Sequence, residues 1–239
     1  IVLPPATRGE IALAIRQHVV AGLSLDDYAR AGAFNGTAFA SANPRNAADI
    51  DGRTDSAIND DIAARLKTAV RARRNILISG GTSTGKTTFL NALLREIPAD
   101  ERLIVIEDTP ELQLTHANSV GLLAARGQLG EAEVSAEDLL IASLRMRPDR
   151  IILGEMRGGE ALTFLRAINT GHPGSLSTIH ADSPERAIDQ LVLLVMQSGS
   201  KMGWEDVSRY VRRSLDLIVQ LDRHGGTRRL DSILEMPRD

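Results

Sequence analysis

The chain has 239 residues, of which 43% are hydrophobic and 25% are charged, which is typical of one large globular domain, or one domain and part of another. Its net charge of −3 argues against nucleic-acid binding, which needs a strongly basic face, and we predict no specific nucleic-acid binding. There is no cysteine to form a disulfide and no apolar run long enough to span a bilayer, so any membrane role is expected to be peripheral.

The first fifty residues carry weak structural signals. The chain begins at Ile1 rather than methionine, so we expect it to be a fragment that lacks preceding sequence. Apolar residues alternate over residues 11–16, which predicts a strand that closes a sheet of upstream residues. A helix is predicted to begin after Ser24, with Asp27 completing the cap. Residues 32–54 are rich in small and polar side chains without periodicity, which predicts a linker.

Predicted helices and strands alternate over the rest of the chain. Helices are predicted for residues 56–72, 87–96, 136–146 and 158–170, from 184 onward, and for 204–214. Strands are predicted for residues 75–79, 102–106, 150–154, 174–180, 217–221 and 229–234, and residues 111–134 are interpreted as irregular strands and loops. This alternation predicts an α/β fold with a mostly parallel, doubly wound sheet. Polar groups that end four of the strands would meet at the carboxyl edge, where such sheets bind ligands.

One stretch carries a strong motif. Residues 80–88 match the phosphate-loop pattern G-x-x-x-x-G-K-[ST] between a predicted strand and a predicted helix. Glycines let backbone N–H groups approach phosphates, Lys86 supplies a charge to the β- and γ-phosphates, and the Thr87 hydroxyl can bind Mg²⁺. We therefore predict a nucleoside triphosphate with Mg²⁺, bound by Gly80, Gly81, Thr82, Ser83, Thr84, Gly85, Lys86, Thr87 and Thr88.

Two carboxylates end neighbouring predicted strands. The strand predicted for residues 150–154 ends on Gly154, at the position where a P-loop enzyme usually has a magnesium-binding Asp, and Glu155 follows. We assign the magnesium-water role to Glu155 and the positioning of the attacking water to Glu107. The sequence fixes no distances, so these two catalytic roles can be exchanged. The alternative for either carboxylate is an ion pair with a nearby arginine.

Histidine and arginine supply the other candidates. His180 ends a strand and is a candidate catalytic residue that senses the γ-phosphate, although a structural hydrogen bond is the alternative. The five histidines lack the spacing of metal ligands, which makes a zinc site improbable. Arg145, Arg147 and Arg157 surround the third core strand and are candidates to neutralise phosphate charge, including across a subunit boundary. The remaining arginines are expected to pair with nearby carboxylates.

Four motifs in this order resemble those of the type II/type IV secretion ATPases, above all the hexameric ATPase of type IV secretion and conjugation systems. They are the phosphate loop (80–88), Ile-Glu-Asp-Thr-Pro-Glu-Leu (106–112) for the family's Asp box, residues 143–157 for its degenerate Walker B motif, and residues 170–181 for its His box. A glycine at position 154 is normal in this family.

The resemblance implies a RecA-like ATPase domain over residues 55–239, preceded by a linker (32–54) and by the remnant of an α+β N-terminal domain (1–31). Arg16 then matches the position from which that domain presents an arginine to the phosphates. The implied activity is Mg²⁺-dependent ATP hydrolysis that energises substrate export or pilus biogenesis. The implied assembly is a homo-hexamer that works with inner-membrane and coupling components of a secretion system, in the cytoplasm and peripheral at the inner membrane.

Three other functions remain open. A type II secretion ATPase or a pilus assembly or retraction ATPase shares the motifs, but such proteins often carry a four-cysteine zinc module, which this chain lacks. A P-loop kinase would need an acceptor pocket, and the His-box segment argues against it. A nucleotide-dependent binding switch would bind ATP without useful hydrolysis.

Overall fold

The computed structural model describes residues 4, 6, 8–11, 22–41, 55–125 and 133–237. Strands and helices alternate along the described chain, as predicted. The strands are β1 (Ala38–Ser41), β2 (Ile76–Gly80), β3 (Leu103–Glu107), β4 (Ser119–Leu123), β5 (Arg150–Leu153), β6 (Leu176–Ile179), β7 (Leu217–His224) and β8 (Thr227–Glu235). The helices are α1 (Leu25–Arg30), α2 (Asp55–Arg71), α3 (Lys86–Leu94), α4 (Ala136–Ser143), α5 (Glu160–Asn169), α6 (Pro184–Gln197) and α7 (Trp204–Ser214).

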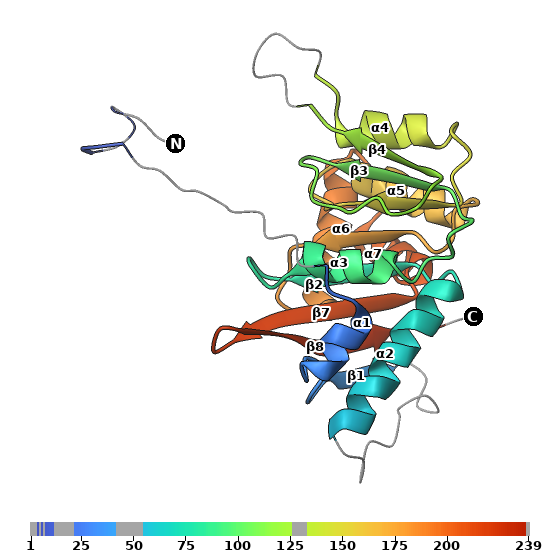
Figure 1. Ribbon diagram of the computed structural model, residues 1–239. Coiled ribbons are helices and arrows are strands. Elements are labelled where there is room, and N and C mark those ends of the chain that lie inside the picture. Colours follow the sequence, from blue (N-terminus) through green and yellow to red (C-terminus); the bar gives the residue numbers. More distant parts are fainter. Residues whose placement is uncertain are drawn as a thin grey trace.

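The strands form one sheet in the order β1-β8-β7-β2-β6-β5-β3-β4 (Figure 1). Every neighbouring pair is parallel except β7 and β8, which form an antiparallel hairpin. The predicted mostly parallel α/β sheet is therefore confirmed. Parallel strands need crossover connections, and the helices between them supply these.

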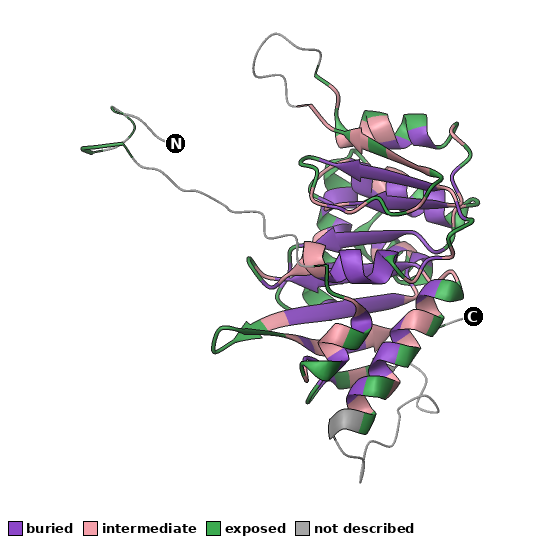
Figure 2. Cartoon of the chain, viewed as in Figure 1, coloured by how far each residue is buried: buried purple, intermediate pink, exposed green. Residues whose placement is uncertain are grey.

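Helices cover both faces of the sheet. In Figure 1, α1, α2 and α3 lie in front of the sheet, whereas α5, α6 and α7 lie behind it. Successive side chains of one strand enter opposite cores: Ile76 and Ile78 pack under α1–α3, and Leu77 packs under α4–α7. The central strands are therefore apolar throughout and buried on both sides (Figure 2).

Side-chain caps fix where two of the helices begin. The Ser24 hydroxyl accepts a hydrogen bond from the backbone N–H of Asp27, whose carboxylate accepts from the backbone N–H of Ser24. Ser135 and Asp138 form the same reciprocal box at the start of α4. Both boxes were predicted from the sequence, and both are confirmed.

The linker prediction is wrong for its first part. Strand β1 pairs in parallel with β8 at the edge of the sheet. Before it, Phe34 is fully buried and its backbone N–H donates to Asn59 Oδ1 at 2.9 Å, while the Thr37 hydroxyl donates to the carbonyl of Leu230 at 2.9 Å. The sequence did not predict this strand for two reasons. It is short and consists mostly of small residues, and its partner strand lies almost 200 residues later in the sequence. Residues 42–54 lie outside the described residues, and the proposed domain division stays a prediction.

Two other amino-terminal predictions fall outside the structure's coverage. Of the strand predicted over residues 11–16, only Ile11 is described, and it is exposed. Arg16 lies outside the described residues. In the part of the chain that the structure describes, no helix has both the length and the hydrophobicity needed to cross a bilayer.

Candidate nucleotide site

Four strand ends meet at one edge of the sheet. Strands β2, β6, β5 and β3 are consecutive neighbours and all run in the same direction. Their carboxyl ends carry, in this order, the glycine loop, His180, Glu155 and Glu107. The structure therefore brings the predicted catalytic residues and the loop to the same edge, which is where parallel sheets place their ligands.

The loop has a backbone conformation that its sequence allows. Gly85 has φ 94° and immediately precedes α3, and Ser83 has φ 63°. At Gly80, a Cβ atom would lie 2.5 Å from Thr84 Oγ1 and 2.9 Å from the carbonyl oxygen of Leu221, so only glycine fits between the loop and β7. The N-terminus of α3 therefore faces the concave loop, a geometry that favours a bound anion.

Lys86 lies across the loop. Its Nζ donates to the carbonyl oxygens of Gly80 at 2.8 Å and Gly81 at 3.0 Å. Thr84 Oγ1 also donates to the Gly81 carbonyl, at 2.9 Å. The ammonium group is thus held at the mouth of the loop, where it can meet the phosphates of a nucleotide.

Arg228 supports the loop from the β7–β8 hairpin, and sequence reasoning missed it. Its Nε donates to the Ser83 carbonyl at 3.3 Å, and its Cδ lies 3.1 Å from the position of a Cβ on Gly85. No local pattern reveals it, since 145 residues separate the partners.

Glu107 is a buried carboxylate at this edge, with a relative exposure of 8%. Its Oε1 accepts hydrogen bonds from the backbone N–H groups of Glu111 at 2.9 Å and Leu112 at 2.8 Å. Burial raises the pKa of Glu107; the two hydrogen bonds oppose this rise and the charge of Glu111 adds to it. A carboxylate with a raised pKa is a better proton acceptor, as a general base requires.

Gly154 leaves room for Glu107. A Cβ at position 154 would lie 3.3 Å from Glu107 Cγ and 3.5 Å from the carbonyl oxygen of Ile106. An aspartate at 154 would therefore press against Glu107. The glycine that is unusual for a P-loop enzyme thus has a steric reason in this chain.

Glu155 forms an ion pair, the alternative that the sequence left open. Arg157 Nε donates to Glu155 Oε2 at 2.7 Å, and Arg157 Nη1 donates to Asp108 Oδ2 at 2.7 Å. Burial lowers the pKa of Arg157, but the two carboxylates outweigh burial and raise it. Arg157 therefore contacts carboxylates rather than the loop, and it connects the ends of β3 and β5.

The remaining predicted site residues lie at opposite edges of the sheet. His180 is exposed and lines a cavity of about 340 Å³ with Glu155 and Arg157. Arg145 and Arg147 are exposed between α4 and β5, at the amino edge. They therefore lie at the opposite edge of the sheet from the loop of their own chain. A contact across a subunit boundary stays a prediction.

The oxygen-bearing side chains at this edge fit a magnesium ion that is also coordinated by the phosphates of a nucleotide. Thr87 lies in the first turn of α3, and Glu155 and Glu107 end neighbouring strands. Among the described residues, no three acidic or histidine side chains are close enough to form a metal cage. Mg²⁺ at nucleotide sites keeps several waters and takes only one or two protein ligands besides the phosphates. These residues therefore suit such a site.

A model of the family described as "Type II/IV secretion system protein" matches residues 44–230. The chain belongs to this family. It is 38% identical to the type IV secretion system protein VirB11 of Bartonella quintana over 251 residues, which cover 99% of this chain and 70% of that protein. The predicted resemblance to the type IV secretion ATPases is therefore confirmed.

Solved structures agree with this family assignment. The VirB11 ATPase of the Brucella suis type IV secretion system, in complex with sulphate, matches with a TM-score of 0.69 and 33% identity over 92% of this chain and 65% of that one. The pilus retraction motor PilT with bound ADP matches with a TM-score of 0.58 and 28% identity over 73% of this chain and 51% of that one. The chain thus spans about two thirds of the solved VirB11 chain, and it is less similar to the pilus motor.

Proposed function

We propose that this chain carries the Mg²⁺-dependent ATPase activity of a bacterial type IV secretion or conjugation motor, which energises substrate export or pilus biogenesis. One observation carries the proposal: a phosphate loop lies on the same sheet edge as a buried carboxylate whose pKa is raised. The sulphate bound by the Brucella VirB11 structure and the ADP bound by the PilT structure support an anion and nucleotide site in this chain.

The residues have distinct tasks in this proposal. The loop N–H groups and Lys86 bind the phosphates, and Glu107 accepts the proton of the attacking water. Thr87 and, through water, Glu155 hold Mg²⁺, which supplies positive charge to the phosphate oxygens when it is bound. His180 lies beside Glu155 and is proposed to sense the γ-phosphate. Arg157 donates hydrogen bonds to both Glu155 and Asp108 and so keeps the two carboxylates together.

The assembly is part of the same proposal. Relatives named for type IV secretion systems support a motor that works with inner-membrane and coupling components. We propose a homo-hexamer at the cytoplasmic face of the inner membrane, with peripheral membrane contact. In that ring, Arg16 of the amino-terminal segment contributes a further charge to the phosphates.

Substitution of the loop lysine tests the proposal. Lys86→Ala is expected to lower steady-state ATPase turnover at least 100-fold, because the phosphates lose their charged partner. Thr68→Ala is a matched control, since this exposed hydroxyl donates to the Ala64 carbonyl within its own helix. Undiminished turnover in the Lys86 variant would contradict the assignment. Tight ATP binding without turnover in the unaltered chain would favour the binding switch, and phosphate transfer to an acceptor would favour a kinase.

A further inference from the structure

Strand β6 contains a buried threonine, Thr178, to which the proposed ATPase chemistry gives no role. Its relative exposure is 2%, and it points to the same face of the sheet as Leu176, which packs in the core under α1–α3. Valine has the same shape as threonine and a similar preference for strands, so packing alone does not require a hydroxyl here. A buried hydroxyl is costly unless it is hydrogen-bonded, so the contacts of this one indicate why the position is polar.

Thr178 holds the chain on both sides of Glu155. The backbone register between β5 and β6 ends at Leu153. Just beyond it, the Thr178 hydroxyl donates to the carbonyl of Gly154 at 2.7 Å. The backbone N–H of Met156 donates to the carbonyl of Thr178 at 2.9 Å. One residue of β6 therefore fastens the residue before and the residue after this carboxylate.

Gly154 is also held from the other neighbouring strand. Its backbone N–H donates to the carbonyl of Ile106 in β3 at 2.8 Å. Ile106 immediately precedes Glu107, so the backbone of Gly154 links the two strands whose ends carry the two catalytic carboxylates. The hydroxyl of Thr178 extends this link to β6, the strand that leads to His180.

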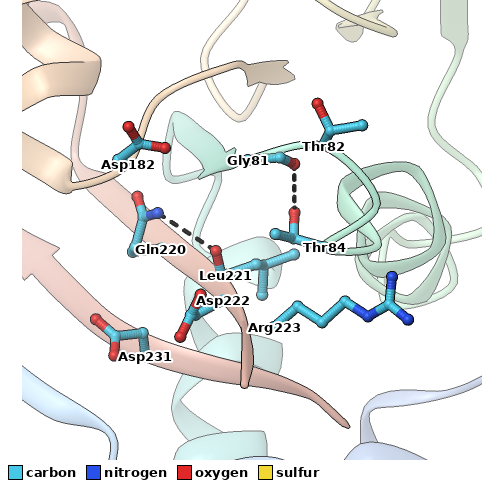
Figure 3. Close-up of a pocket in the computed structure, with 9 residues that line it drawn as sticks. All are labelled: Gly81, Thr82, Thr84, Asp182, Gln220, Leu221, Asp222, Arg223 and Asp231. Carbon is cyan, nitrogen blue, oxygen red and sulfur yellow. Dashed lines mark hydrogen bonds between the residues drawn. The ribbon is translucent and has the colours of Figure 1, made fainter. Parts of the chain in front are cut away.

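The segment after His180 is fastened to the opposite neighbours. The Ser79 hydroxyl and Gln220 Nε2 each donate to the carbonyl of Ala181 at 3.3 Å. Figure 3 shows Gln220 lining, together with residues of the phosphate loop, a pocket of about 470 Å³ that belongs to the nucleotide site. The end of β6 is thus tied to β2 and β7 through Ala181 and to β5 through Thr178.

We infer that Thr178 is a positioning residue for Glu155, an assignment that rests on the proposed magnesium-water role of Glu155. Its hydroxyl fixes the Gly154 carbonyl, so that the carboxylate that follows stays in place beside the phosphates. The ion pair of Glu155 with Arg157 is partly exposed, and such pairs are weak, so it does not fix this position by itself. Hydrogen bonds behind a metal-binding carboxylate orient it, and their loss typically weakens metal affinity or activity about 10–100-fold.

Two substitutions at Thr178 separate the hydroxyl from packing. Thr178→Val keeps the shape but leaves the Gly154 carbonyl without this donor, whereas Thr178→Ser keeps the donor and removes a methyl group. The dissociation constant of Mn²⁺, which stands in for Mg²⁺, is measured by electron paramagnetic resonance with ADP bound, and turnover is measured against Mg²⁺ concentration. The valine variant is expected to raise the Mn²⁺ dissociation constant and the Mg²⁺ concentration for half-maximal turnover by about 10-fold or more. The serine variant should keep both values, despite a lower melting temperature.

Thr37→Val is the matched control. This buried hydroxyl also donates to backbone carbonyls, those of Phe34 and Leu230, and it precedes β1, which β8, β7 and β2 separate from β6. The control is expected to lower the melting temperature and to leave Mn²⁺ affinity unchanged. Affinity for ADP in EDTA should be the same in all variants, because none of them alters the phosphate loop.

Three outcomes would overturn the inference: a valine variant that binds Mn²⁺ like the unaltered chain, a serine variant that also loses affinity, or an equal loss in Thr37→Val. The serine result counts even where the valine variant fails to fold. Glu155→Gln is measured in parallel. If it leaves Mn²⁺ affinity and the Mg²⁺ requirement unchanged, the proposed metal role of Glu155 fails, and the role of Thr178 fails with it. If it weakens both while Thr178→Val does not, the role of Thr178 alone fails.

Discussion

At the scale of single residues, burial decides which carboxylate is suited to accept a proton. Glu107 is held by two backbone N–H groups and covered by the chain, whereas Glu155 is tied to a cation at the surface. Desolvation favours the protonated form of Glu107 and raises its pKa, whereas both Glu155 and its partner Arg157 lie at the surface. The sequence left the two roles exchangeable because both residues end apolar strands. Their environments favour Glu107 as the base.

Glu107→Gln is expected to separate turnover from stability. The glutamine oxygen can still accept from both backbone N–H groups, so the melting temperature should not fall, while turnover should fall by about 100-fold or more if Glu107 is the general base. The unaltered enzyme should lose turnover as the pH falls, starting above the ordinary glutamate pKa of about 4.3 because burial raises the pKa of Glu107. Steady-state rates and thermal unfolding from pH 5 to 8 check this.

The sign of the stability effect also follows from that pKa. Because the folded-state pKa exceeds the unfolded value, the native state binds the proton more tightly. The contribution of Glu107 to the free energy of unfolding therefore decreases as the pH rises through these two values. The glutamine variant should lack this decrease. A variant that is equally active, or whose stability has the same pH dependence as the unaltered chain, would contradict the role of Glu107.

At the scale of secondary-structure elements, a buried ion pair fastens the amino edge of the sheet. Arg150 is fully buried, and its Nε and Nη2 donate to the two oxygens of Glu101 at 2.6 Å and 2.8 Å. Its Nη1 donates to the carbonyls of Val70 at 2.7 Å and Gly174 at 3.3 Å. Burial raises the pKa of Glu101, but its contacts with Arg150 outweigh burial and lower it. One side chain thus links α2, β5 and the loop before β6.

Arg150→Met is expected to lower the free energy of unfolding by about 3–5 kcal/mol, because Glu101 is then left buried without its main partner. Replacing both residues, Arg150→Met with Glu101→Leu, should recover part of this loss, since no buried charge remains unpaired. Arg145→Met, on the exposed segment nearby, should change stability by less than about 0.5 kcal/mol. Urea unfolding of the three variants checks the order. An Arg150 variant as stable as the Arg145 variant would contradict this account.

The elements that the sequence predicted are those with strong local signals. Apolar runs located the central strands, and serine boxes located the starts of α1 and α4. Strand β1 was missed, and β4 was predicted only as part of a region of irregular strands and loops, because edge strands are half-exposed, short and poor in β-branched residues. Motif spacing located the loop and Glu107, but Arg228 reaches the loop only through the pairing of β8 with β7 and of β7 with β2. The second of these pairings spans some 140 residues, and no local pattern encodes it.

At the scale of the whole molecule, residues 22–41 pack onto the ATPase sheet. Leu25 and Phe34 are fully buried, and Tyr28 contacts the ring of Phe89 in α3 edge-on at 5.2 Å. Tyr28 also stacks on Phe34 at 6.2 Å, and burial raises the pKa of its hydroxyl to about 12. Phe89 lies one turn after Lys86, so this aromatic cluster connects the amino-terminal segment to the helix of the phosphate loop. The amino-terminal segment and the helix of the phosphate loop therefore pack into the same hydrophobic core.

A chain that begins at Asp55 should consequently be less stable and less active than one that begins at Gly22. Each fully buried large apolar side chain contributes about 1.5–3 kcal/mol, so the loss of Leu25 and Phe34 alone removes several kcal/mol of packing. The exposed edge of β8 should also promote association between strands. Thermal unfolding by circular dichroism, light scattering and ATP turnover of the two chains provide the test. If both chains melt together and hydrolyse ATP equally, the ATPase unit begins after the linker as the sequence predicted. A lower melting temperature for the shorter chain instead places the start of that unit near Gly22.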